Sequence, residues 1–142
     1  MTLTTTDAEV VFATLPAPET LRGRFAARAQ TLPGTATLPA PLRRLALVIV
    51  NAVVSILYRG KEFHVTCGAN LWALGKRRVP FEFVHDRDCV RISYDLPENP
   101  AAVRRIVSEV REQSPQRQLC RLSIRTRTGT RTLLYFTLEP RP

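Results

Sequence analysis

Alternation of apolar and polar residues is clearest near the end of the chain, from Gln118 to Pro140. Apolar side chains fall on the even positions on both sides of a turn, and most odd positions are polar. Such a period of two predicts a hairpin with one buried face and one solvent-facing face. A three-residue loop at Thr128–Thr130 keeps the apolar residues on one face. The predicted cross-strand pairs are Thr126 with Thr132, Ile124 with Leu134, Leu122 with Phe136, and Cys120 with Leu138.

A similar pattern predicts an earlier hairpin, with Phe81 and Phe83 on one strand and a turn at Asp86–Asp88. The apolar residues of its second strand are Val90, Ile92, Tyr94 and Leu96.

Between the hairpins the apolar spacing changes to that of a helix. Asn99 is suited to cap this helix and Pro100 to occupy its first turn, so we expect a helix ending near Gln113. Its expected buried residues are Ala102, Val103, Ile106, Val107 and Val110. Upstream, alternation over Lys61–Cys67 predicts one more strand.

The most apolar segment is Leu42–Tyr58. Its length favours a helix, although its β-branched residues keep a strand as the alternative. Its longest uncharged part, Leu45–Tyr58, is interrupted by Asn51 and Ser55 and is shorter than the about 20 residues that span a bilayer. We therefore expect no membrane segment, but a helix that is buried on most sides or lies at a subunit contact.

Residues 1–40 are rich in proline, threonine and alanine and are expected to form an N-terminal arm. A short strand at Glu9–Ala13 and a short helix at Glu19–Gln30 are predicted there, and a flexible arm is the alternative. Residues 41–142 are predicted to form the core domain. The resulting fold class is α+β, with an antiparallel or mixed sheet of two hairpins covered by helices on one side.

The net charge of +9 suggests a nucleic acid or an acidic partner, although the basic residues are spread along the chain. Three widely spaced cysteines favour a reducing, intracellular compartment over a disulfide framework. The first residues lack the basic and apolar regions of a secretory signal.

Two groups of residues are candidates for a binding site. The first is a weak candidate for zinc, in two close pairs: His64 with Cys67 and His85 with Cys89. The second is a basic face of the last hairpin that would suit phosphates: Arg121, Arg125, Arg127 and Arg131. The sequence contains no nucleophile elbow or phosphate loop. An enzyme is therefore the least favoured class, and no cofactor is expected.

The order of short motifs from Val79 to Leu138 resembles the adenovirus early region four open reading frame three protein family. An aliphatic–His pair, Val84–His85, precedes a polar turn, and the next strand ends near Asp95–Leu96. A later strand opens with Cys-x-Leu at Cys120 and returns through Gly129 to Leu138. The resemblance implies a viral, non-enzymatic, self-assembling protein of the host nucleus that captures host antiviral and DNA-damage-response factors.

We therefore expect an interaction protein that forms a homodimer or a higher oligomer. Its expected contact residues are apolar side chains of the Leu42–Tyr58 segment and of the last hairpin: Leu47, Ile49, Val53, Leu57, Leu133 and Tyr135. A small basic nucleic-acid-binding protein, with or without zinc, is the alternative.

Overall fold

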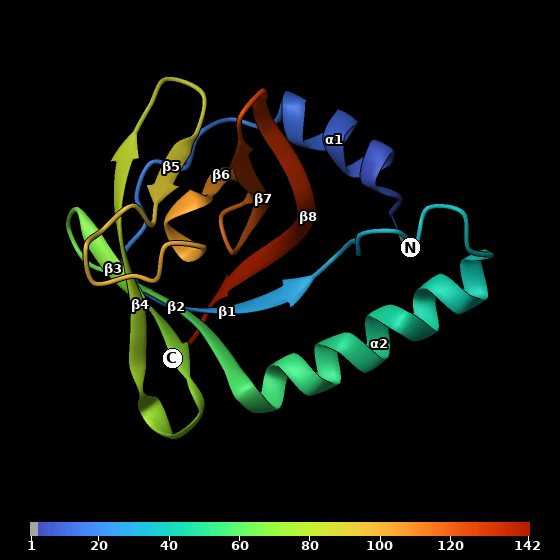
Figure 1. Cartoon of the computed structure of the whole chain (residues 1–142), viewed down its shortest axis with the longest axis horizontal. Coiled ribbons are helices and arrows are strands. Elements are labelled where there is room, and N and C mark those ends of the chain that lie inside the picture. The colour runs from blue at the N-terminus through green and yellow to red at the C-terminus, as the bar shows by residue number, and fades with distance from the viewer. Residues whose placement is uncertain (1–2) are drawn as a thin grey trace.

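The structure is a computed structural model that describes residues 3–142, and its centre is a closed antiparallel barrel of eight strands (Figure 1). Neighbouring strands in the chain are also neighbours in the barrel. The strands are β1 (Gly23–Ala29), β2 (Tyr58–Phe63), β3 (Cys67–Trp72), β4 (Arg77–His85), β5 (Val90–Ser93), β6 (Ile106–Ser114), β7 (Arg117–Thr126) and β8 (Gly129–Pro140). The helices are α1 (Thr5–Thr14), α2 (Ala40–Leu57) and the single-turn 3-10 helices η1 (Ala73–Gly75) and η2 (Val103–Arg105).

Strand β1 closes the barrel because it pairs with both β2 and β8. Gly23 lies opposite Phe63 of β2, and Ala27 lies opposite Leu138 of β8. Closure leaves no open sheet edge, which removes a common site of aggregation.

The inner face of the barrel forms the main core. Its centre is Phe63, whose ring packs edge-on against the rings of Phe25, Phe81 and Phe83. The predicted apolar faces of both hairpins contribute to this core, including Val90, Ile92, Tyr94, Cys120, Phe136 and Leu138.

The expected α+β fold is therefore wrong: the sheet is a closed barrel of eight strands and not two hairpins with helices on one side. The segment predicted as a helix from Asn99 to Gln113 contains only η2 followed by strand β6. Strand β6 pairs with β5 and β7 on its two sides, and Ser108 is fully buried. Two-sided strand pairing outweighs the local helical spacing here, as it often does for β-branched segments.

The two elements predicted in residues 1–40 also differ from those observed. Glu9–Ala13, predicted as a strand, lies within helix α1, whose capping box joins Thr4 and Asp7. Glu19–Gln30, predicted as a helix, contains strand β1. Its alanines have good helix propensity, but Phe25, Ala27 and Ala29 alternate with Arg24, Ala26 and Arg28 along a strand.

The last hairpin is a hairpin as predicted, but its register differs. Strand β7 ends at Thr126, which pairs with Gly129, so the loop has two residues and not three. A register shift between Leu122 and Ser123 then places Leu122 opposite Leu134 and Cys120 opposite Phe136. From Gln118 to Leu122 the observed cross-strand partners are displaced by two residues from the predicted ones. A displacement of two residues keeps each side chain on its predicted inner face.

Helix α1 covers part of the outer surface of β7 and β8 (Figure 1). A second, smaller core lies between them, formed by Ala8, Phe12, Leu119 and Tyr135. The Phe12 and Tyr135 rings lie edge-to-face with centroids 5.8 Å apart. The outer side of the last hairpin is therefore partly covered by the protein's own N-terminal helix.

Candidate functional site

Helix α2 lies beside the barrel in the long connection between β1 and β2 (Figure 1). The predicted helix in this segment is confirmed, but the expectation that most of its sides are buried is wrong: Leu47 is its one buried residue. Asn51 attaches the helix to β1, since its Oδ1 accepts a 2.8 Å hydrogen bond from the Ala29 N–H and its Nδ2 donates a 3.0 Å bond to the Ala29 carbonyl. The side of the helix that carries Asn51 therefore faces the barrel.

The opposite side of α2 is apolar and exposed. Its residues are spaced alternately by three and four positions, so they form one line along the helix. We call this line the outer seam; it comprises Leu42, Leu45, Ile49, Ala52 and Ile56. The four large side chains of the outer seam are between 53 and 66 % exposed. Contiguous apolar exposure of this kind is typical of surfaces that contact another protein or a membrane.

No charged residue lies between Arg44 and Arg59, and the two polar residues of that stretch, Asn51 and Ser55, are not part of the outer seam. By length and composition α2 is also the one helix in residues 3–142 that is long and apolar enough to cross a membrane. Core helices of soluble proteins can have the same length and composition, so these two properties do not by themselves indicate a membrane span.

A cavity of about 490 Å³ lies between the other flank of α2 and the barrel interior. Val53 and Leu57 of α2 contribute to its wall and are about half exposed, so the cavity reaches the surface there. Leu134 and Phe136 of β8 lie on the barrel side. We call this space the barrel cavity; its volume falls in the range of ordinary small-molecule sites.

A polar cluster lies at the wall of this otherwise apolar cavity. Its centre is Lys61 of β2, which is 3 % exposed. The Lys61 ammonium donates to Asn70 Oδ1 at 2.7 Å and to the Tyr94 hydroxyl, while Tyr58 donates to the same Asn70 oxygen at 3.0 Å. Desolvation raises the pKa of the Tyr58 hydroxyl to about 12, so Tyr58 is neutral at physiological pH.

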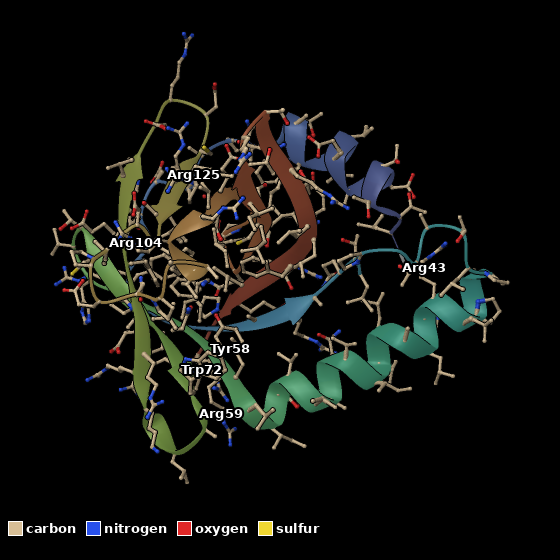
Figure 2. All side chains as sticks on the ribbon, viewed as in Figure 1. Arg43, Tyr58, Arg59, Trp72, Arg104 and Arg125 are labelled. Carbon is tan, nitrogen blue, oxygen red and sulfur yellow. The ribbon has the colours of Figure 1, made fainter. Side chains whose placement is uncertain are left out.

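Trp72, from β3, lies next to this cluster. Its ring packs edge-on against Tyr58 with centroids 5.3 Å apart, where α2 runs directly into β2 (Figure 2). The Trp72 indole nitrogen is buried and has no hydrogen-bond partner within residues 3–142. Buried donors are rarely left unpaired, so this nitrogen marks a position suited to an acceptor.

The six expected contact residues lie in different parts of the structure and do not form one surface. Ile49 belongs to the outer seam, Val53 and Leu57 line the barrel cavity, and Leu47 points to the barrel. On the last hairpin Tyr135 is completely buried beneath α1 and Leu133 is partly buried.

Two arginines of the expected basic face are held in contacts within the chain. Arg121 pairs with Glu109 and, at 2.7 Å, with Glu9 of α1. Arg125 donates to the Arg104 carbonyl at 2.9 Å, and both side chains form ion pairs with the same carboxylate, that of Asp95. Arg127 and Arg131 are exposed near the tip of the hairpin.

The weak zinc candidates lie at two turns, with His64 and Cys67 flanking the β2–β3 turn and His85 and Cys89 flanking the β4–β5 turn. Burial raises the pKa of the Cys89 thiol, which disfavours the thiolate that binds zinc. Across residues 3–142, no three His, Cys, Asp or Glu side chains are grouped as metal ligands would be.

Sequence reasoning missed Lys61 and Trp72 as site residues. One signal was present for Lys61: it is two positions before Phe63, so a strand places both side chains on the same inner face. The outer seam was also visible as a spacing of three and four from Leu42 to Ile56.

Together these features define the protein as a closed β-barrel with an apolar cavity and an exposed apolar helix. Comparison with known proteins gave no matching family model, curated protein or solved structure.

Proposed function

We propose that this protein is a non-enzymatic interaction protein that self-associates through the outer seam of α2. The observation that carries the proposal is the exposure of four large apolar side chains in one line: Leu42, Leu45, Ile49 and Ile56. Each would lose its contact with water against a second copy, and burial of apolar area is the main driving force of association.

The spacing of the outer seam favours another helix as its partner. Alternate steps of three and four residues are the repeat by which two α-helices pack along a common line. Because the same seam is present on every copy, two copies can bury it against each other in a symmetric contact.

The attachment of α2 argues against its crossing a membrane. A spanning helix places its two ends on opposite sides of the bilayer, and 18 residues are slightly short of the about 20 required. The strands that precede and follow α2, β1 and β2, pair with each other in the barrel. They therefore cannot lie on opposite sides of a bilayer, as the two ends of a spanning helix would require.

The viral and nuclear role implied by the family resemblance stays a prediction. The α+β core on which that resemblance partly rested is wrong, so the proposal of self-association rests on α2 alone. Nucleic-acid binding by the basic face also stays a prediction, to be tested by the salt dependence of binding.

The first test is a charge placed in the outer seam. Ile49→Glu should convert the self-associated protein into a monomer in size-exclusion chromatography with light scattering, because the contact would have to bury an unpaired carboxylate. Val65→Glu is the matched control, since Val65 is an exposed valine in the β2–β3 turn, away from α2.

Equal masses for Ile49→Glu and the wild type would contradict the proposal. So would a wild type that stays monomeric at high concentration. Flotation of a monomeric wild type with anionic vesicles, abolished by Ile49→Glu, would assign the outer seam to a membrane surface instead.

A further inference from the structure

The barrel cavity combines a long apolar wall with a single cationic group. Most of its lining is aliphatic, whereas Lys61, Asn70, Tyr58, Tyr94 and Trp72 bring polar atoms to one region. Small-molecule sites have this composition, in which apolar surface provides affinity and a few placed polar groups fix the orientation of the ligand.

Lys61 is a buried cation without an anionic partner. None of the ion pairs within residues 3–142 includes it. Its surroundings supply neutral oxygens and aromatic rings, with the nitrogen 5.1 Å from the Tyr94 ring centroid and 5.3 Å from that of Phe81. A buried charge is costly unless it is paired, so this arrangement suits a ligand that brings a negative charge.

The ammonium form of Lys61 persists at neutral pH. Burial is the largest influence on the pKa of Lys61 and acts to lower it, but the hydrogen bond that the Tyr94 oxygen accepts favours the ammonium, and the net direction is upward. An ammonium has three N–H donors, and two of them are used by Asn70 and Tyr94. Among residues 3–142 the third donor forms no further hydrogen bond within 3.5 Å, so it can turn to a ligand.

Trp72 supplies a second, independent indication of a ligand. Trp72, whose indole N–H is buried and has no partner within residues 3–142, is one of the residues that line the same cavity as Lys61. A carboxylate has two oxygens and can accept from two donors at once.

We infer that the barrel cavity binds a free long-chain carboxylate, with its head group at Lys61 and Trp72 and its hydrocarbon chain along the aliphatic wall beneath α2. The carboxylate provides the charge that Lys61 lacks and the acceptor that Trp72 lacks. The chain replaces water against Val50, Val54, Leu122 and Leu134. This inference is independent of self-association, because Ile49 is not among the residues that line the cavity.

Binding can be followed with the protein's own fluorescence. Trp72 is the single tryptophan of the chain and lies in the cavity wall, so a ligand there should change its emission. We expect saturable binding of dodecanoate to the full-length wild type, and binding at least about tenfold weaker for dodecanol, which has the same chain but no charge.

A charge-removing variant tests the role of Lys61. Lys61→Met keeps an unbranched side chain of similar length and should lower dodecanoate affinity by about tenfold or more, while dodecanol affinity changes little. Lys76→Met is the matched control, because Lys76 is the other lysine of the chain and is exposed in the β3–β4 connection. Circular dichroism should show that both variants keep the β-sheet spectrum of the wild type.

Blocking the cavity provides a second variant. Leu134→Trp should weaken dodecanoate and dodecanol together, as followed by calorimetry, whereas Ile49→Glu should bind dodecanoate as the wild type does. Three results would overturn the inference: no saturable binding of dodecanoate, equal binding of dodecanoate and dodecanol, or unchanged dodecanoate affinity in a folded Lys61→Met variant.

Discussion

Lys61 and Glu62 are neighbours in β2 with opposite surroundings, since successive side chains of a strand point to opposite faces. The Lys61 side chain lies inside the barrel, where its contacts are to neutral groups. Glu62 lies on the outer face, where Arg77 Nη2 donates to it at 3.2 Å and Arg24 Nε lies 3.5 Å away. The same strand thus carries an unpaired cation inside and a paired anion outside.

Glu62 gives the protein a predictable response to acid. The hydrogen bond from Arg77 is the main reason that the pKa of Glu62 is lowered. A carboxylate with a lowered folded-state pKa stabilises the fold above its unfolded pKa, and this contribution is lost as pH falls through the folded pKa. Glu62→Gln should therefore be less stable than the wild type near neutral pH, and the difference should shrink below about pH 4.

Urea unfolding at neutral and acidic pH measures this difference. Glu98→Gln is the control, because Glu98 is exposed and forms no ion pair within residues 3–142. A difference between Glu62→Gln and the wild type that grows on acidification would contradict the assignment of the ion pair.

Among the elements, α1 packs on the outer surface of β7 and β8 through Phe12. Phe12 is 1 % exposed and lies between the Tyr135 ring and the guanidinium groups of Arg111 and Arg121, which are 4.9 and 4.8 Å from its centroid. Its packing therefore holds α1 on β7 and β8 and covers Tyr135.

Phe12→Ala should destabilise the protein by about 3–5 kcal/mol, because it removes a buried aromatic side chain and leaves a cavity. Val10→Ala on the same helix should cost far less, since Val10 is 64 % exposed. Chemical denaturation of both variants measures the two free energies of unfolding. Similar losses for the two variants would show that α1 is not held by Phe12.

The elements also show what the sequence can predict. Both hairpins and α2 follow from local periodicity, because their apolar residues match one period over a long run. The β6 segment does not, since Ala102, Val103, Ile106 and Val110 fit a helix and only the flanking strands decide the outcome. Barrel closure depends on β1 pairing with β8 across more than 100 residues of sequence, which no local pattern encodes.

The candidate site was predictable to a similar extent. The sequence predicts that α2 is unusually apolar and that Ile49 belongs to a contact surface, and Ile49 is exposed in the structure. The cavity, by contrast, is formed by residues from α2 and several strands, including Val54, Lys61, Trp72 and Phe136, which meet only because the barrel closes.

At the scale of the whole molecule, charge and apolar surface would act against each other in the proposed self-association. Each copy carries a net charge of +9, and Arg43, Arg44 and Arg59 lie at the two ends of α2. Either orientation of two paired helices places arginines near arginines, so the copies repel each other while the outer seam attracts.

Added salt should therefore strengthen self-association. Screening reduces the repulsion between the copies and leaves burial of the outer seam in place. We expect the dimer dissociation constant to fall several-fold between low and moderate sodium chloride, as measured by light scattering over a dilution series. Weaker association at higher salt would point to a contact made by opposite charges, and nucleic-acid binding would also weaken with salt.

Sedimentation equilibrium of the wild-type protein at moderate salt is the most direct test of self-association through α2. The proposal predicts a mass of twice the 16.0 kDa chain, or a higher multiple, and a mass of one chain for Ile49→Glu under the same conditions. A wild-type mass of 16.0 kDa across the full concentration range would contradict it.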